Sequence, residues 1–521
     1  MASAVVLGSC RDATGVELTL TTDIDCRDMG STAILASRTS AQAEPLATTS
    51  SCQPDGTIGT LVIVPASERD EPLQVRVITS IGVPIEQCMG ATLGSSCIES
   101  RRRLHFIPHE MLRLPVRQEL DCRGVACGET LTCRQGTCVS DAVPDACLAD
   151  PSSCEETPPA KVLPVGPGKA YADPCAAIAA ARAGDTIEVD AGTYTVSCPV
   201  PISLTVRGVG GRAVLRAPEP LANDKAILAV EGDGVDFTAE NLEFTGAVTS
   251  GQTGSPHSGL FFRGRDLTVR GCVFDGNDTG LLTGTGRAIL IEGSEFRDNG
   301  SAAGSAVVTH NVNIGAVETL TFRASWSHGA KTGHLIKSRA RTSYILASRL
   351  TDGPDSTTSD NVDLPNGGEC YLVGNLLEQA NGGNSNMVRM GEEGNTYGDA
   401  TRLVVAHNTF VNRLDYGEFV KTLNVAAPTV VNNLFLGGGN LPADSVVAGN
   451  LNRPISALST DLVAADTYDY HLQAGAPAID AGVEAAAYLG SVPLMSYVDP
   501  LQQEPRTTRG AAPDSGAFER D

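Results

Sequence analysis

The chain is poor in aromatic residues, in long apolar runs and in positive charge. Phe, Trp and Tyr make up 4% of its 521 residues, and the formal net charge at pH 7 is -23. A strongly negative chain is a poor partner for nucleic acid, because phosphate binding needs clustered lysines and arginines. No run of about 18 apolar residues is present, so no segment has the length of a membrane-spanning helix.

Several catalytic motifs are also missing. The sequence contains no G-x-S-x-G, no H-E-x-x-H, no P-loop and no dinucleotide-binding fingerprint. Their absence argues against the enzyme classes that those motifs serve. What the chain has instead is 55 glycines and 41% apolar residues. This composition favours many short strands joined by tight turns over long amphipathic helices.

Cysteine is nearly absent after residue 200. Thirteen of the fifteen cysteines precede that point, without the paired spacing that zinc sites need. We therefore expect disulfides, and with them an oxidising compartment and a secreted protein. The two exceptions, Cys272 and Cys370, stand in strand-like sequence and are expected to be small buried core residues.

The first residues have the small-residue ending of an export signal without its positive start or its full apolar length. We interpret residues 1–9 as a truncated signal, and we expect the reading frame to begin upstream of Met1. Leu7-Gly8-Ser9-Cys10 resembles a bacterial lipobox. The resemblance implies an outer-membrane lipoprotein that is anchored at the cell surface through lipidated Cys10. The alternative is that Met1 is the true start and Cys10 belongs to a disulfide.

Three regions precede the main domain. Residues 10–119 alternate short apolar and polar runs between turns, which predicts an antiparallel β-sandwich. Residues 120–140 are too short for an apolar core, and two disulfides are expected to hold them. Residues 141–168 are rich in proline and predict a linker, clipped by Cys147 with Cys154. The segment DCRGVACGETLTCRQGTC resembles a module at the front of secreted lipoproteins of myxobacteria.

Residues 169–450 predict a right-handed parallel β-helix, and residues 451–521 predict its last coils and cap. Asp173 and Pro174 can open a short helix, which Gly184-Asp185 separates from a first strand. This start and the closing text HLQAGAPAID…DSGAFE resemble pectin-lyase-like proteins. One large apolar residue recurs per coil: Phe244, Phe274, Phe296, Trp326, Leu350, Leu377, Phe410 and Phe435. Two residues before the later anchors stand Ser348, Asn375, Asn408 and Asn433, which we interpret as a stabilising asparagine ladder.

One outward column of the predicted β-helix is polar on five successive coils. When Val312, Ile336, Val362, Val388 and Val420 are aligned as inward residues, the outward neighbours are Asn313, Lys337, Asp363, Arg389 and Lys421. Residues 321–350 add six lysines and arginines and no acidic residue. Such a cationic island would attract the carboxylates or sulfates of a polymer. The alternative is a solvated face with casual ion pairs.

The stretches THNVNIG, GHLIKSRA and DLPNGG resemble a subgroup of bacterial right-handed β-helix repeat proteins. Lys337-Ser338 is also similar to the segment that holds the catalytic lysine of chondroitinase B and related alginate lyases. That resemblance implies that Lys337 takes the proton beside a uronate carboxylate, that a following arginine assists, and that Ca²⁺ or another cation neutralises the carboxylate. Those lyases place Arg-His-Gly on the next coil, where this chain has Asp363-Leu364-Pro365-Asn366. Arg389 would have to substitute.

The expected catalytic residues are therefore Lys337, Arg339 and Arg389. Asp363 with Glu392 is the expected calcium pair, Glu393 is a further candidate ligand, and the alternative is that both glutamates belong to a solvated loop. The cations Arg339 and Arg341 should favour the neutral amine of Lys337. An outward lysine carries little packing, so its removal should cost about 0.5 kcal/mol or less. The expected substrate-binding residues are His310, Asn313, His334, Asp363, Asn366 and Lys421.

Two functions fit this sequence. The first is a polysaccharide lyase or epimerase that acts on an acidic, uronate-containing glycan. The second is a non-catalytic carbohydrate-binding or adhesive surface protein that uses the same groove. They differ in whether changing Lys337 abolishes turnover while glycan retention persists. For either function we expect a monomer that has no nucleic-acid partner and that contacts a membrane only through its lipid anchor.

Overall fold

The computed structural model divides the chain into two compact units, Met1–Pro159 and Ala160–Asp521. Residues 1–9 and Cys10, Cys147 and Cys154 lie outside the described residues, so the signal, the lipidation and the clip stay predictions. No helix within the described parts of the chain is long and apolar enough to cross a membrane. The structure describes residues 14–37, 44–53, 56–65, 72–90, 93–107, 109–134, 136–143, 160–249, 256–301, 309–353, 357–380, 385–414 and 416–520.

The first unit is the predicted small β-sandwich, but it is not wholly antiparallel, because Gly15–Thr22 pairs in parallel with Met111–Gln118. Alternate side chains of its first strand, Val16, Leu18 and Leu20, are buried in the same core as Val75 and Val77. One sheet has the order β4 (Thr57–Ile63), β1 (Gly15–Thr22), β7 (Met111–Gln118). The other has the order β3 (Ala47–Thr49), β2 (Met29–Ser37), β5 (Pro72–Ile81), β6 (Cys97–His105).

Disulfides hold this unit, which confirms the expectation from its cysteine content. The cysteine-dense segment forms the hairpin β8 (Leu131–Arg134) and β9 (Thr137–Ser140). Cys122–Cys133 and Cys127–Cys138 tie this hairpin to the residues before it, and Cys26–Cys52 and Cys88–Cys97 lie in the sandwich. A segment too short for its own core is thereby fixed by covalent bonds.

The start of the second unit corrects the predicted boundary of the linker. The strand β10 (Val162–Val165) pairs in parallel with β11 (Thr186–Thr195), so the β-helix begins inside the predicted linker. The predicted helix is α2 (Pro174–Ala180), with Asp173 accepting a hydrogen bond from the Ala176 N–H at 3.0 Å. Cys175 of α2 is bonded to Cys198, so a disulfide also lies inside the β-helix. This disulfide ties the short helix α2 to the strand that begins at Cys198.

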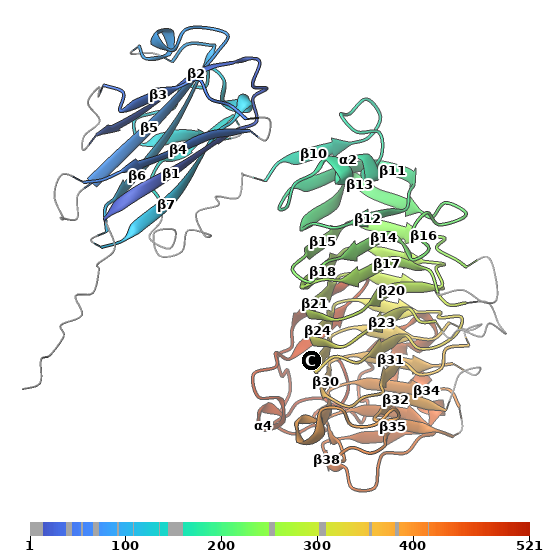
Figure 1. Ribbon diagram of the computed structural model, residues 1–521. Helices are drawn as coiled ribbons and strands as arrows, with labels where there is room; N and C mark the ends of the chain where they lie inside the picture. Colours follow the sequence, from blue (N-terminus) through green and yellow to red (C-terminus); the bar gives the residue numbers. More distant parts are fainter. Residues whose placement is uncertain are drawn as a thin grey trace, which may run out of the picture. The chain divides into compact units, whose positions relative to one another are not determined.

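The second unit is a right-handed parallel β-helix in which three strands make one coil (Figure 1). Strands at equal places in successive coils pair in parallel and form three rows. The first row holds β10, β11, β13 (Leu204–Arg216), β15 (Asp236–Glu240), β18 (Asp266–Arg270), β21 (Gly286–Glu292), β24 (Val317–Arg323), β27 (Thr342–Leu346), β30 (Glu369–Val373), β33 (Arg402–Ala406), β36 (Thr429–Val431) and β38 (Val446–Ala448).

The second row adjoins the first row in the same 21-stranded sheet, and the third row is a separate 9-stranded sheet. The second row holds β16 (Leu242–Thr245), β19 (Val273–Asp275), β22 (Glu295–Arg297), β25 (Trp326–His328), β28 (Arg349–Thr351), β31 (Leu376–Gln379), β34 (Thr409–Asn412), β37 (Leu434–Gly437) and β39 (Leu451–Arg453). The third row holds β12 (Cys198–Val200), β14 (Ala226–Glu231), β17 (Ser258–Arg263), β20 (Thr279–Thr283), β23 (Val312–Ile314), β26 (Ile336–Ser338), β29 (Val362–Leu364), β32 (Asn386–Met390) and β35 (Glu418–Thr422).

The predicted anchors stack in register, with one exception. Phe274 pairs with Phe296, and the later anchors continue to Phe435, but Phe296 pairs with Ser327 rather than Trp326. Trp326 is wrong as an anchor because its side chain faces outward, where it stacks on His328 at 3.8 Å. The two free cysteines among the described residues, Cys272 and Cys370, are buried as expected.

The asparagine ladder is present and is longer than predicted. Asn375, Asn408 and Asn433 each donate their amide to the side-chain oxygen of the next residue in the column, at 2.9–3.0 Å, and the column ends at Asn450. A second ladder, Asn277, Asn299 and Asn311, was not predicted. Its residues lie between the second and third rows of strands, at irregular spacing in the sequence.

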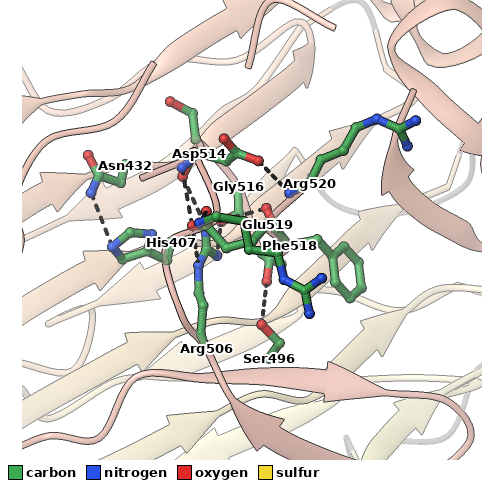
Figure 2. A network of polar contacts seen from close by, with 12 residues as sticks. His407, Asn432, Ser496, Arg506, Asp514, Gly516, Phe518, Glu519 and Arg520 are labelled. Atoms are coloured by element: carbon green, nitrogen blue, oxygen red, sulfur yellow. Dashed lines mark hydrogen bonds and ion pairs between the residues drawn. The ribbon is translucent and has the colours of Figure 1, made fainter. Parts of the chain in front are cut away.

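The C-terminal residues pack along the outside of the last coils. Tyr470 and Phe518 join a core with Leu376 and Leu434 of the second row. The tail closes around Arg506, whose guanidinium donates to Glu519 Oε1 at 2.6 Å and to the carbonyls of Asp514 and Phe518 (Figure 2). The predicted cap therefore covers a side of the helix. The other segments here are α3 (Leu458–Asp461), β40 (Leu462–Ala464), β41 (Asp469–Leu472), α4 (Ala486–Leu489), β42 (Met495–Val498) and β43 (Gln502–Pro505).

Candidate functional site

The predicted outward column lies on the 9-stranded sheet in the expected register. Asn313 pairs with Lys337, Lys337 with Asp363, Asp363 with Arg389 and Arg389 with Lys421. Their inward neighbours, from Val312 to Val420, are fully buried. Because coils stack at about 4.8 Å, five polar side chains from residues far apart in the sequence become neighbours.

The centre of this column is much less accessible than an outer face usually is. The side chain of Asp363 is 0% exposed, that of Lys337 13% and that of Arg389 14%. Charges that are removed from water cost free energy unless opposite charges surround them. A cluster of this kind on an otherwise solvated sheet is a candidate for a functional site.

Asp363 lies among a lysine, an arginine and a histidine. Its Oδ2 lies 3.0 Å from Lys337 Nζ and 3.3 Å from His334 Nε2, and its Oδ1 lies 3.8 Å from Arg389 Nε. The structure therefore brings together four of the residues that the sequence nominated. It also changes the expected surroundings of Lys337, because the nearest charges to its ammonium are carboxylates and not arginines.

Asp360 is a second buried carboxylate, which the sequence analysis missed. It is fully buried, and its Oδ2 lies 2.7 Å from Arg389 Nη2 and 3.1 Å from His334 Nδ1. Asp360, His334 and His310 each precede the inward residue of their coil by two positions. Aligning that position as well as the outward one would have shown this second column.

His310 and His334 stack on neighbouring coils, with ring centroids 4.9 Å apart. The backbone N–H of His334 donates to His310 Nδ1 at 3.0 Å, which assigns the proton of a neutral His310 to Nε2. Burial, together with the charges of His334, Lys337 and Arg339, lowers the pKa of His310 well below its usual value. His310 is therefore a neutral imidazole at physiological pH.

The loop between β32 and β33 supplies two further carboxylates. Glu392 pairs with Arg389 at 2.7 Å. Glu393 accepts hydrogen bonds from Arg339 Nη2 at 2.8 and 2.9 Å and lies 3.3 Å from Lys337 Nζ. Partial burial opposes ionisation of Glu393, but the hydrogen bond from Arg339 and the charge of Lys337 outweigh it and lower its pKa. The sequence offered Glu393 only as a further calcium ligand and not as a partner of Arg339 and Lys337, because it stands in a loop to which the alignment of strands does not extend.

The remaining predicted residues lie at the margins. Asn313 and Lys421 are half-buried at the two ends of the column. Asn366 lies beneath the loop, where its carbonyl accepts a hydrogen bond from the Thr396 N–H at 2.9 Å. The substrate-binding roles of these residues stay predictions.

The cationic island is not one surface. Arg323 pairs with Glu292 at 2.7 Å on the 21-stranded sheet, and Arg349 lies between the rings of Trp326 and Tyr468, at 4.0 and 4.1 Å. Consecutive strands of a coil belong to different rows, so neighbouring cations in the sequence point in different directions. The partners come from other coils, which a local charge count does not include.

The expected calcium pair does not fit that ion. Asp363 faces Lys337, His334 and Arg389, and Glu392 is paired with Arg389, so each carboxylate already has a cation beside it. Within the described ranges, no three His, Cys, Asp or Glu side chains form a group that could hold a metal ion. Whether calcium takes part in the function stays untested.

Comparisons with known proteins add a fold likeness only. No family model and no curated protein matches the chain. A pectate lyase, Pel9A, is similar in structure with a TM-score of 0.49 and 16% identity, over 69% of this chain and 96% of that one. The pectin methylesterase from Aspergillus niger gives a TM-score of 0.27 and 15% identity, over 64% and 95%. The parallel β-helix described above rests on the strand pairing and not on these likenesses.

Proposed function

We propose that this protein acts on an acidic polysaccharide lying along the 9-stranded sheet, by β-elimination or epimerisation at a uronate, with Lys337 as the base. One observation carries the proposal. Lys337 Nζ lies 3.0 Å from a fully buried carboxylate, Asp363, that is itself in contact with His334, and the lysine side chain is still 13% exposed. This arrangement gives the lysine a partner that can exchange protons with it and that solvent does not reach.

A lysine can act as a base only after it has lost its proton. Asp363 can accept that proton, which leaves a neutral amine beside a neutral carboxylic acid. In water the charged pair is strongly favoured, but desolvation disfavours both charges. A glycan that covers the sheet removes the remaining water from Lys337 and so shifts the pair toward the neutral form.

The two arginines then have different roles. Arg339 is 31% exposed at the rim and is suited to neutralise the substrate carboxylate, which makes the adjacent proton more acidic. Arg389 is tied to Asp360 and Glu392, so it positions the buried carboxylates rather than touching substrate. In elimination, Lys337 takes the C5 proton, the C4–O bond breaks, a C4=C5 double bond forms, and the departing glycosidic oxygen takes a proton from Lys337 or from water. In epimerisation, Lys337 takes the C5 proton on one face, and water delivers a proton to C5 on the other face.

The test is incubation of the full-length protein with a panel of uronate polymers, with and without calcium. We expect ultraviolet absorbance from unsaturated ends, or deuterium uptake at C5 from D₂O if the reaction is epimerisation. Lys337→Ala should lose activity on the order of a hundredfold or more and still retain the glycan. If the variant keeps most of an observed activity, Lys337 is not the base. Salt-sensitive binding without turnover would favour the non-catalytic function instead.

We also propose that the protein is displayed at the cell surface through a lipid on Cys10. The disulfides of both units fit an oxidising, extracellular compartment. Metabolic labelling with a fatty acid tests this proposal. Label should enter the native protein and be lost in Cys10→Ser, whereas an unlabelled native protein would contradict the anchor.

A further inference from the structure

Glu393 occupies the position that a ligand carboxylate would need. Its two oxygens lie 2.8 and 2.9 Å from Arg339 Nη2, and one of them lies 3.3 Å from Lys337 Nζ. Within the described part of the chain, the ion pairs of Arg339 are to Glu393. Arg339, 31% exposed, is the more accessible of these two cations and lies where a polymer would arrive.

The contact can open without unfolding the loop. The backbone N–H of Glu393 donates to the Pro365 carbonyl at 2.8 Å, and Tyr397 Oη donates to the Arg339 carbonyl at 2.8 Å. Backbone anchors therefore hold the loop, and the Glu393 side chain, 43% exposed, can rotate away by itself. Lys337 would keep its buried partner Asp363, while Arg339 would become available.

We infer that Glu393 is a built-in competitor that holds the carboxylate site closed until the uronate carboxylate of a glycan displaces it. The inference rests on the proposed function, because it concerns the same site. An intramolecular carboxylate acts at a high effective concentration, so a single free carboxylate competes poorly with it. A polymer gains further contacts along the column from Asn313 to Lys421, so the site selects extended polyuronates over monosaccharides.

The competitor also affects catalysis. While Glu393 is in place, Lys337 has two carboxylates beside its ammonium. Displacement exchanges Glu393 for the substrate carboxylate, which makes the same contact with Arg339. The C5–H of the uronate then arrives beside Lys337, so the base meets its proton only after Glu393 has been displaced.

The test compares Glu393→Ala with Asp399→Ala in the full-length protein. Asp399 is an exposed residue of the same loop, so both changes remove one negative charge from it. Glu393→Gln, which keeps the shape of the side chain, guards against an effect of lost packing. The probes are trigalacturonate, measured by calorimetry, and acetate, followed by NMR of the Arg339 side-chain N–H.

We expect Glu393→Ala to bind trigalacturonate about tenfold or more tightly than the wild type, because a site that is mostly closed loses affinity in proportion to the closed fraction. Asp399→Ala should change binding less than about twofold, and Arg339→Ala should abolish the gain. An equal gain in both alanine variants, or none in Glu393→Ala with either probe, would overturn the inference while leaving glycan turnover by the wild type unaffected. If acetate reaches Arg339 only in Glu393→Ala but no variant binds trigalacturonate, the competitor stands and the proposed substrate fails.

Discussion

Two faces of the β-helix carry ladders of lysine or arginine paired with aspartate. The pairs are largely exposed on one face and largely buried on the other. On the 21-stranded sheet, Arg287 pairs with Asp266, with 65% and 28% of the side chains exposed. On the 9-stranded sheet, Lys337 pairs with Asp363, with 13% and 0% exposed. Exposed pairs contribute about 0–1 kcal/mol, whereas breaking a buried pair leaves an uncompensated charge. The exposed ladder covers its sheet with polar groups at little cost in free energy. The buried ladder requires the desolvation of several charges, and a chemical role would explain why the protein keeps it.

Removing the buried carboxylate should give the largest effect. We expect Asp363→Ala to lower the free energy of unfolding by about 3–5 kcal/mol, because Lys337 and Arg389 lose their buried counter-charge. Trp326 is the single tryptophan of the chain and lies in the β-helix, so its fluorescence reports unfolding of this unit. A loss below about 1 kcal/mol would contradict the difference between the two faces.

Lys337→Ala should affect rate more than stability. The loss of a general base should cost on the order of a hundredfold in turnover. The stability cost should be about 1–3 kcal/mol, since Asp363 loses a partner but keeps His334 and Arg389. This expectation replaces the smaller cost expected from the sequence, because Lys337 is 13% exposed and paired with Asp363 and is therefore not a solvated lysine. Initial rates and Trp326 fluorescence measured on one preparation separate the two effects, and a variant that loses stability but no rate would make Lys337 purely structural.

Acidification should weaken the buried face through His310. Its pKa is lowered in the folded protein, while the unfolded chain takes up a proton below about pH 6.5. Unfolding is therefore favoured as the pH falls from the unfolded value toward the folded one, by about 1.4 kcal/mol per pH unit for this group. His310→Gln should show a shallower loss of stability between pH 7 and 5. Parallel pH profiles for the variant and the wild type would show that His310 is not the titrating group.

The exposed face should give the smallest effect. Arg287→Ala should change the free energy of unfolding by about 0.5 kcal/mol or less and should leave glycan binding unaltered. High salt should reduce even this difference. If Arg287→Ala proved as damaging as Asp363→Ala in the same unfolding experiment, burial would not be what separates the two faces.

The fold and the outward column could be predicted because both depend on a repeated pattern. Inward valines and isoleucines recur on each coil, and they fix which neighbour points outward, as Lys337 and Asp363 do. The prediction that Trp326 points inward was wrong because it rested on the size of the side chain alone. The core of that coil is filled by Phe322, whose ring centroid lies 6.1 Å from that of Phe296.

The site could be predicted only in part, because its charge balance depends on partners from other coils. Asp360 lies two residues before β29, and Glu393 lies in the loop that follows β32. Neither residue is therefore part of the outward column. The acidic partners of the cationic island are also far away in the sequence. Asp499, for example, is 150 residues from its partner Arg349. Local sequence therefore located the buried charged cluster but gave it the wrong electrostatic character.

The most direct test of the account is the footprint of a polyuronate on the wild-type protein, followed by amide hydrogen exchange. We predict slower exchange in residues 333–341 and 391–401, which line the buried cluster, and unchanged exchange in residues 265–288 on the exposed ladder. Protection confined to residues 265–288, or no protection anywhere under conditions in which the glycan is bound, would contradict the assignment of function to the 9-stranded sheet.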